Sequence, residues 1–267
     1  MMKKSLVLQA EQVTVDFDGF VAVNQMNLEL EEGELRFLIG PNGAGKTTML
    51  DMMCGKTKPT AGQIIYRDAE GLEHDVTKMK EYNISELGIG RKFQSPSIFG
   101  SLTVYENMEL AMRQSHSIWT QLWAKRTPQE KEKIMNKLEL IGLPHLANVR
   151  AGSLSHGQKQ WLEIGMILIE EPRLLLFDEP VAGMTDAETE KTGHLLREIA
   201  KTSSVVVVEH DMDFVRAFAQ KVTVMHEGKF LFEGTMDQVS ADSKVREVYL
   251  GKGKEREAIA AGEVPVG

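Results

Sequence analysis

The chain has 267 residues, enough for one elaborated domain or two small ones. Lys and Arg number 31 against 39 Asp and Glu, and this net charge of −8 disfavours general nucleic-acid binding, which needs clustered basic residues. The single cysteine, Cys54, excludes an internal disulfide and fits a reducing compartment. No apolar run approaches the roughly 20 residues that span a bilayer, so we expect a soluble chain that reaches a membrane only through a partner.

The first predicted element is an antiparallel hairpin. Residues 13–17 and 21–30 alternate apolar and polar side chains, and Asp18-Gly19 between them is typical of a tight turn. Phe17 and Phe20 lie at this turn. The simplest interpretation is that both are ordinary core residues, and the alternative depends on the segment that follows.

A glycine-rich loop comes next, at residues 40–48, which read Gly-Pro-Asn-Gly-Ala-Gly-Lys-Thr-Thr. Residues 35–39 before it are mostly apolar and strand-like, and residues 49–53 after it indicate a helix. Strand, glycine-rich loop and helix form the context in which a P-loop pattern is meaningful. The loop's glycines let backbone N–H groups turn inward, and together with the positive end of the helix they form a nest for phosphate.

The pattern therefore predicts a nucleotide site. Lys46 can reach the β- and γ-phosphates, and the Thr47 hydroxyl can bind Mg²⁺. Phe17 then has a second interpretation, since its spacing to the loop favours it over Phe20 for stacking on the nucleotide's base. The expected binding residues of the loop are Gly40, Pro41, Asn42, Gly43, Ala44, Gly45, Lys46, Thr47 and Thr48.

The middle of the chain changes from mixed to helical patterning. Residues 69–75 form a polar excursion, residues 78–87 predict a short helix, and residues 89–93 predict a strand that Gln94 follows directly. Helical periodicity then dominates residues 96–152, which we expect to form an inserted helical subdomain. Its clearest periodic segments are residues 104–112 and 129–141.

Buried strands alternate with helices in the last part of the chain. Strands are expected at residues 174–177 and 205–208, each followed by a helical segment, and a hairpin is expected over residues 222–232. This alternation predicts a parallel sheet with helices on both faces. Residues 252–267 are charged and small, and we expect them to be a poorly ordered tail.

Three polar segments follow predicted strands, at the ends where ligands of parallel sheets bind. Asp178 is placed to hold Mg²⁺, and Glu179 beside it could take a proton from an attacking water, or could serve only as a charge at a helix N-terminus. His210 could reach the γ-phosphate, although a hydrogen-bonded structural histidine is the alternative. Gln94 could sense Mg²⁺ or the water.

A second anion site is predicted where Ser155 and Gly157 open a helix. The chain's own nucleotide already has its phosphates at the P-loop. A second site is therefore most useful for a nucleotide that is bound to another subunit.

Taken in order, these motifs resemble the ATP-binding cassette (ABC) transporter family over about residues 6–251. Residues 40–47 resemble its Walker A motif, and Asp178-Glu179 its Walker B motif with the catalytic glutamate. Gln94 is similar to the Q-loop, His210 to the switch histidine and Phe17 to the A-loop aromatic.

Besides Gln160-Trp161, which replaces the usual basic residue after the signature, two segments depart from the family pattern. Residues 154–158 resemble the signature Leu-Ser-Gly-Gly-Gln, but His156 replaces its first glycine. Residues 182–185 read Ala-Gly-Met-Thr where the D-loop usually has Ser-Ala-Leu-Asp, and Asp186 comes one place later. The D-loop's contact with an opposite subunit is therefore open at the aspartate.

The resemblance implies an α/β fold of the P-loop NTPase (RecA-like) type. Its parts would be a mostly parallel sheet with helices on both faces, an N-terminal antiparallel β subdomain and the helical insert. The nucleotide-binding core would comprise residues 1–95 and 153–251. The implied activity is ATP hydrolysis by two cassettes that close head to tail around two ATP molecules.

The implied site combines residues of two subunits. Catalysis would use Glu179, His210 and Gln94, and the metal would be held by Thr47, Gln94 and Asp178. The nucleotide would contact Phe17 and the P-loop residues of one chain, with Ser155, Gly157 and Gln158 of the other. ATP and Mg²⁺ are the implied cofactors.

Finer resemblances concern the transported solute. Residues 67–87, 91–94, 102–107 and 249–251 resemble the branched-chain amino-acid importer branch of the family. Within that branch, the stretches 155–166 and 180–186 are most similar to an ATPase subunit of bacterial urea importers. This implies uptake of a small polar solute, urea first, with branched-chain amino acids as the alternative. Lipopolysaccharide export and a soluble role in translation or DNA maintenance follow as weaker alternatives.

The importer resemblance also implies partners. A second related ATP-binding subunit, either a different chain or a second copy, would close with this one. Two transmembrane permease subunits and, indirectly, a periplasmic substrate-binding protein would complete the system. The chain would lie at the cytoplasmic face of the bacterial inner membrane and would not bind nucleic acid.

Overall fold

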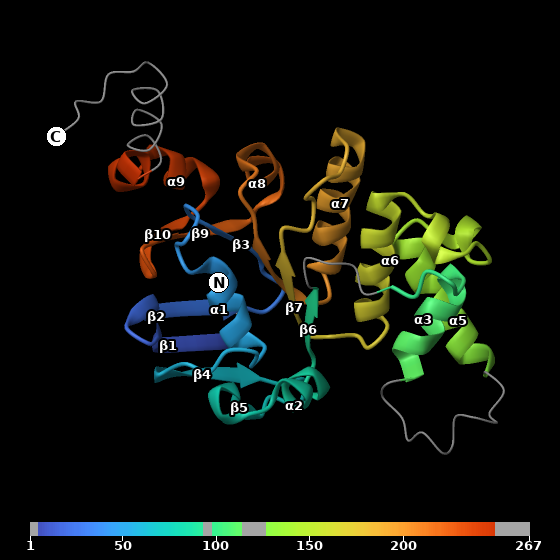
Figure 1. The fold of residues 1–267 in the computed structure, drawn as a ribbon, viewed down its shortest axis with the longest axis horizontal. Coiled ribbons are helices and arrows are strands. Elements are labelled where there is room, and N and C mark those ends of the chain that lie inside the picture. The colour runs from blue at the N-terminus through green and yellow to red at the C-terminus, as the bar shows by residue number, and fades with distance from the viewer. Residues whose placement is uncertain (1–4, 93–97, 114–126, 249–267) are drawn as a thin grey trace.

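The computed structural model describes residues 5–92, 98–113 and 127–248 (Figure 1). The strands are β1 (Leu6–Phe17), β2 (Phe20–Glu31), β3 (Leu35–Ile39), β4 (Ala61–Arg67), β5 (Glu73–Asp75), β6 (Ile89–Lys92), β7 (Leu174–Asp178), β8 (Ser204–Val208), β9 (Lys221–His226) and β10 (Lys229–Gly234). The α-helices are α1 (Lys46–Met53), α2 (Glu81–Glu86), α3 (Val104–Arg113), α5 (Pro128–Leu140), α6 (His156–Leu168), α7 (Asp186–Ile199), α8 (Met212–Phe218) and α9 (Met236–Ala241), with 3₁₀ turns at Val76–Lys78, Pro144–Leu146 and Ala151–Ser153. No helix among these described residues is both long and apolar enough to traverse a bilayer.

The smaller sheet is antiparallel, with the strand order β2-β1-β4-β5. Its first hairpin places Phe17 opposite Phe20 around the predicted turn. This confirms the N-terminal antiparallel part of the fold.

The larger sheet has the order β10-β9-β3-β8-β7-β6, and all of its neighbouring pairs are parallel except β9 with β10. The register places Leu38 and Asp178 each beside Val208. The carboxyl ends of β3, β7 and β8 therefore meet at one edge, as the sequence predicted for a mostly parallel sheet.

Alternation along the buried strands divides the core into two clusters. Phe37, Phe177 and Val207 point into the cluster that contains the helices after residue 98, while Leu176 and Val206 point into the one that contains α1 and the smaller sheet. Because successive side chains of a strand face opposite sides, wholly apolar strands can serve both clusters.

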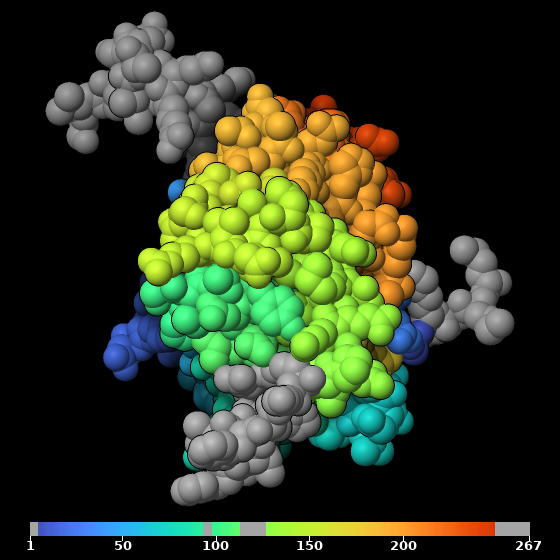
Figure 2. Space-filling view, turned by 90° about the vertical axis from the view of Figure 1, so that its right-hand side faces the viewer, coloured from blue at the N-terminus to red at the C-terminus, as the bar shows by residue number. Residues whose placement is uncertain are grey.

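Helices α3, α5 and α6 lie together at one side of the sheet, and this side faces the viewer in Figure 2. Val104, Ile134 and Trp161 of these helices share one apolar cluster with Phe177 of β7. The helical segment is thus packed on the sheet without a separate core. The subdomain boundaries near residues 96 and 152 remain predictions.

Local structure differs from expectation between residues 69 and 87. The predicted helix 78–87 is split, because Met79 is extended and separates a 3₁₀ turn from α2. The carboxylate of Asp75 starts that turn by accepting a hydrogen bond from the Thr77 N–H. The predicted polar excursion also contains a short strand, β5, in which Asp75 pairs with Ile65. Three residues are too few for a periodic signal, so pairing with β4 decides this strand.

Candidate functional site

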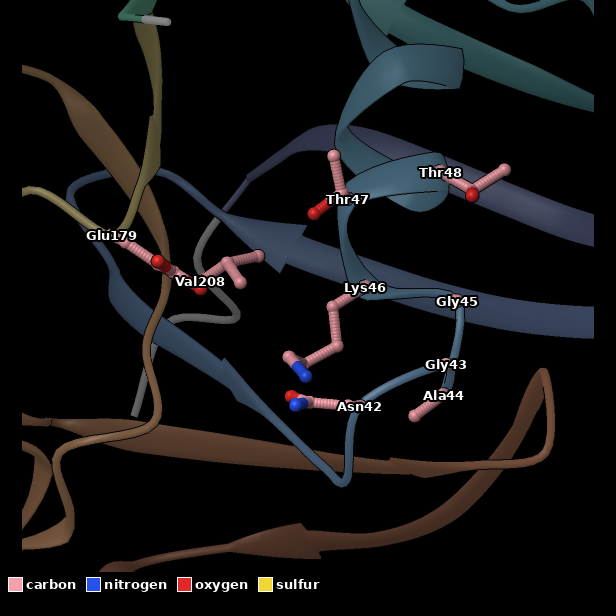
Figure 3. A pocket seen from close by; sticks show the side chains of 9 residues that line it. All are labelled: Asn42, Gly43, Ala44, Gly45, Lys46, Thr47, Thr48, Glu179 and Val208. Carbon is pink, nitrogen blue, oxygen red and sulfur yellow. The ribbon is translucent and has the colours of Figure 1, made fainter. Parts of the chain in front are cut away.

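The P-loop encloses a cavity of about 280 Å³ at the edge where β3, β7 and β8 end (Figure 3). It is lined by Asn42, Gly43, Ala44, Gly45, Lys46, Thr47, Thr48, Glu179 and Val208. Figure 3 shows the Thr47 hydroxyl and the Lys46 side chain on the side of Glu179, with Thr48 pointing the other way. The predicted loop and the predicted acid thus share one cavity, although about 130 residues separate them in sequence.

The loop requires glycine at particular positions. Gly43 and Gly45 have φ of +79° and +90°, values that L side chains rarely adopt. A Cβ atom at Gly45 would lie 2.5 Å from the Ala22 carbonyl oxygen, and one at Gly40 would lie 2.2 Å from that of Met225. Close backbone approach from β2 and β9 therefore shapes the loop, in addition to the turn itself.

Lys46 lies at the centre of the cavity. Its Nζ donates hydrogen bonds to the carbonyl oxygens of Gly40 at 2.7 Å and Pro41 at 3.1 Å. Burial lowers the pKa of Lys46, while the charges of Glu179 and Asp178 oppose that shift. The ammonium group is therefore partly desolvated and held over the loop, where a phosphate group could replace its carbonyl partners.

Thr47 and Asp178 form the predicted metal pair. The Thr47 hydroxyl donates to Asp178 Oδ1 at 3.4 Å, and Asp178 is almost fully buried. Burial raises the pKa of Asp178, while the Thr47 hydroxyl and the Arg91 charge lower it. Among the described residues no cluster of three or more acidic, His or Cys groups could hold a metal alone. A hydroxyl and one carboxylate fit Mg²⁺ bound jointly with phosphate and water.

Glu179 and His210 form a second pair at the cavity edge. Glu179 Oε1 lies 3.4 Å from His210 Nδ1. The Glu179 backbone has φ of +49°, which is uncommon outside glycine, and its N–H donates to the Val208 carbonyl at 2.9 Å. Such strain concentrates at functional sites and here directs the carboxylate into the cavity. Glu179 lines the cavity and His210 is not among its lining residues, and the catalytic roles of both stay predictions.

Sequence reasoning missed a buried cation beneath the metal pair. The Arg91 guanidinium forms an ion pair with Asp51, donates to Cys54 Sγ at 3.2 Å, and has Nη2 3.8 Å from Asp178 Oδ2. Its neighbour Lys92 pairs with Glu163 of α6 at 3.4 Å. Two adjacent charges in the strand predicted at residues 89–93 were the available signal, because charges that a sheet buries are normally paired.

Glu209 is a second missed residue. It is 1% exposed, and its carboxylate accepts hydrogen bonds from the N–H groups of Val181 at 3.4 Å, His210 at 3.0 Å and Asp211 at 3.4 Å. Burial raises its pKa, and the three N–H groups oppose the rise. Glu209 therefore ties the loop after Glu179 to the loop that carries His210.

The predicted second anion site lies at the start of α6, away from the P-loop cavity lining. Ser155 is the N-cap, its hydroxyl accepts from the Gln158 N–H at 3.2 Å, and Gln158 Oε1 accepts from the Ser155 N–H at 3.0 Å. A Cβ atom at Gly157 would lie 2.4 Å from Glu188 Oε1, so the Glu188 side chain packs closely against this glycine. Ser155, Gly157 and Gln158 thus form a separate helix start, as a site serving another subunit would need.

At the D-loop, the structure shows a local role for the residue that departs from the family pattern, while its contact with an opposite subunit stays open. The position at which the family pattern has aspartate is Thr185, which caps α7 by accepting from the Glu188 N–H at 3.4 Å. Threonine and aspartate are interchangeable as N-caps to within roughly 1 kcal/mol. Asp186 is simply the first residue of α7.

Comparisons with known proteins agree with this geometry. The sequence profile described as "ABC transporter" matches residues 23–182. The chain belongs to the ABC transporter family. Members of this family are ATPases that hydrolyse ATP to drive transport, and this cassette has their fold. A second profile, described as "Branched-chain amino acid ATP-binding cassette transporter", matches residues 231–255.

Individual relatives span nearly the whole ABC cassette. This chain is 34% identical to the high-affinity branched-chain amino acid transport ATP-binding protein LivG of Escherichia coli K12. The alignment covers 92% of this chain and 98% of LivG. The chain is 32% identical to BraF of Pseudomonas aeruginosa, with the same two coverages. The crystal structure of the ADP conformation of MJ1267, an ABC transporter cassette, superposes with a TM-score of 0.81 at 29% identity, covering 93% of this chain and all of that one.

The predicted roles of Phe17 and Gln94 in this ABC cassette stay predictions. Phe17 ends β1 with half of its surface exposed, next to Phe20, and it is not among the residues that line the P-loop cavity. Its stacking on a base stays a prediction. Gln94 falls outside the described residues, as do the tail and residues 249–251.

Glu209→Gln should lower both stability and turnover. Glutamine has one acceptor oxygen, so its amide NH₂ must face at least one N–H that Glu209 now accepts. We expect the free energy of unfolding to fall by about 1–3 kcal/mol. Turnover should fall more than ATP binding, because the His210 loop is displaced while the P-loop is not. Denaturant unfolding would measure the loss of stability, and an ATPase assay beside an ATP titration would compare turnover with binding. Equal losses of turnover and of ATP affinity would contradict the prediction.

Proposed function

We propose that this chain is the ATP-hydrolysing subunit of an importer for a small polar solute. The observation that carries the proposal is the meeting of Lys46, Thr47, Asp178 and Glu179 around one cavity, with the signature helix start outside it. The names of its relatives support a branched-chain amino acid as the solute. These names support branched-chain amino acids better than urea, the solute that the resemblance of residues 155–166 and 180–186 implied.

The chemistry follows from the positions of the side chains. Mg²⁺, when bound by Thr47 and Asp178 with the nucleotide's phosphates, would neutralise phosphate charge. Lys46 would bind the β- and γ-phosphates after exchanging its bonds to loop carbonyls. Glu179 would accept a proton from a water near the γ-phosphate, and His210 would orient the Glu179 carboxylate from 3.4 Å away.

A second subunit would complete the site. Ser155 and Gly157 would present the start of α6 to the γ-phosphate of a nucleotide on the partner's P-loop. A relative in fold, MJ0796, has been solved as a dimer, with a TM-score of 0.70 at 25% identity. The partner here would be a second copy or a related ATP-binding chain. Two permeases in the inner membrane and a periplasmic binding protein would complete the importer.

Mixing two inactive variants tests the composite site. Ser155→Arg should fill the start of α6 and block closure, while ATP still binds to the unchanged P-loop. Lys46→Ala should lose binding but keep an intact signature. If the chain pairs with itself, an equal mixture should regain up to about a quarter of wild-type turnover per site. About half of the dimers are then mixed, and one of the two sites in each mixed dimer is intact.

Two other outcomes are informative. If only a different partner chain completes the site, the mixture should stay inactive and adding that partner to wild type should raise turnover. Full turnover by wild type at concentrations where only monomers are detected would refute the composite site.

Uptake by whole cells would identify the solute. A strain that lacks this chain should be complemented by wild type but not by Glu179→Gln, and labelled leucine and labelled urea should be compared side by side. Restored leucine uptake alone supports the amino-acid assignment, and restored urea uptake alone overturns it. A tagged chain recovered from membranes with an export permease, or without any permease, would contradict an importer role.

A further inference from the structure

One carboxylate joins the starts of two helices that approach from different loops. The Ser155 hydroxyl, at the start of α6, donates to Glu188 Oε1 at 3.2 Å. The Thr185 N–H and hydroxyl, at the start of α7, both donate to Glu188 Oε2 at 3.0 Å. Glu188 therefore connects the signature segment to the end of the D-loop segment within the same chain.

A second contact joins the same two segments. His156 Nε2 lies 3.1 Å from the Ala182 carbonyl oxygen, so the tautomer with a proton on Nε2 donates a hydrogen bond to it. A Cβ atom at Gly183 would already lie 3.4 Å from His156 Nε2. The two departures from the family pattern, His156 and the 182–185 segment, are thus in direct contact.

Ser155 cannot serve Glu188 and a phosphate at once. Its hydroxyl has a single proton, which Glu188 receives in this structure. The Thr185 N–H is the main cause that lowers the pKa of Glu188, so the carboxylate is ionised at neutral pH. An ionised carboxylate next to an arriving phosphate is also repelled by it.

We propose that Glu188 is a positioning residue that holds Ser155 until the γ-phosphate of a partner subunit's nucleotide takes its place. After release of Ser155, Glu188 keeps only its hydrogen bonds to Thr185. Phosphate binding at the signature therefore removes one of the contacts that link the signature segment to the loop after Glu179. His156 keeps the two segments together during the exchange. This inference rests on the composite site of the proposed function.

The test removes the negative charge and one of the two acceptor oxygens of Glu188. Glu188→Gln keeps the side-chain length and can still cap α7, since glutamine serves in a capping box as glutamate does. The variant is made in a Glu179→Gln background, and the whole complex is purified from membranes through a tag on this chain. The measured quantity is the ATP concentration at which nucleotide retention is half-maximal.

Charge competition at Ser155 predicts that Glu188→Gln lowers this concentration by roughly 2- to 5-fold. The melting temperature should stay within about 2 °C of the parent. Glu190→Gln is the matched control on the same helix, because its side chain is 74% exposed and it should change nothing. A residue that serves only as a helix cap would leave the ATP concentration unchanged or raise it, and either result overturns the proposal.

A double variant assigns the effect to Ser155. In a Ser155→Ala background, Glu188→Gln should tighten retention less than it does with Ser155 present, because only the charge repulsion is then relieved. An equal tightening there would overturn the competition for this hydroxyl. Ser155→Arg separates the two proposals. If Ser155→Arg blocks nucleotide retention, the composite site is supported, and the Glu188→Gln measurement then tests the role of Glu188 separately. Normal retention by Ser155→Arg would remove the composite site itself, and this inference with it.

Discussion

Replacing Lys46 with alanine should weaken ATP binding by roughly 10²-fold, about 2.7 kcal/mol, because a half-buried, charge-assisted hydrogen-bond donor to two phosphates is lost. Turnover should fall below detection as a consequence. The structure adds a reason beyond charge. Lys46 Nζ bridges the Gly40 and Pro41 carbonyl oxygens, so alanine also frees the first turn of the loop that must enclose the phosphates.

Binding is best measured by titration calorimetry with ATP and Mg²⁺. Lys78→Ala is a suitable control, since its side chain is 83% exposed and is paired only locally with Asp75. The control should bind like wild type, and both variants should unfold cooperatively. Wild-type affinity in Lys46→Ala would show that the cavity in Figure 3 is not the nucleotide site.

Replacing Glu179 with glutamine should lower hydrolysis by roughly 10²- to 10⁴-fold while leaving ATP bound, since glutamine keeps the size of the side chain but cannot accept the proton. The 3.4 Å contact to His210 should survive as a neutral hydrogen bond. Bound, unhydrolysed ATP should then accumulate in closed dimers. A single-turnover assay with labelled ATP would separate this loss of chemistry from a loss of binding.

Glu171→Gln is an unusually close control. Glu171 lies shortly before β7, whereas Glu179 directly follows that strand. The φ of Glu171, +53°, is close to the +49° of Glu179. It forms an ion pair on the surface with Lys133 at 3.3 Å, which contributes little to stability. Hydrolysis by this variant should be normal. If Glu179→Gln were equally active, Glu179 would return to its alternative role as a helix-start charge.

Most of the fold and of the Walker site could be predicted from the sequence because both are coded locally. The 40–48 pattern fixes its own turn through glycine φ angles, and the apolar run at residues 174–177, followed by an acid, favours a strand buried on both faces. Parallel strands bring their carboxyl ends to one edge. Asp178 therefore had to lie near Thr47, as the 3.4 Å contact confirms.

What the sequence alone could not determine is which side chains meet across elements. Arg91 reaches Asp178, Glu209 gathers three N–H groups, and Glu188 joins two helix starts, yet each is an ordinary charged residue in its own segment. Strand order and helix packing place these partners within a few ångströms, over separations of up to 87 residues for Arg91 and Asp178. Burial then forces Arg91 and Glu209 to pair, because a buried charge without a partner costs several kcal/mol, whereas Glu188 makes its contacts near the surface. Local pattern thus determined the P-loop, the strand-end acids and the helix caps, and the tertiary structure alone decided how the signature, the D-loop and the metal pair are linked.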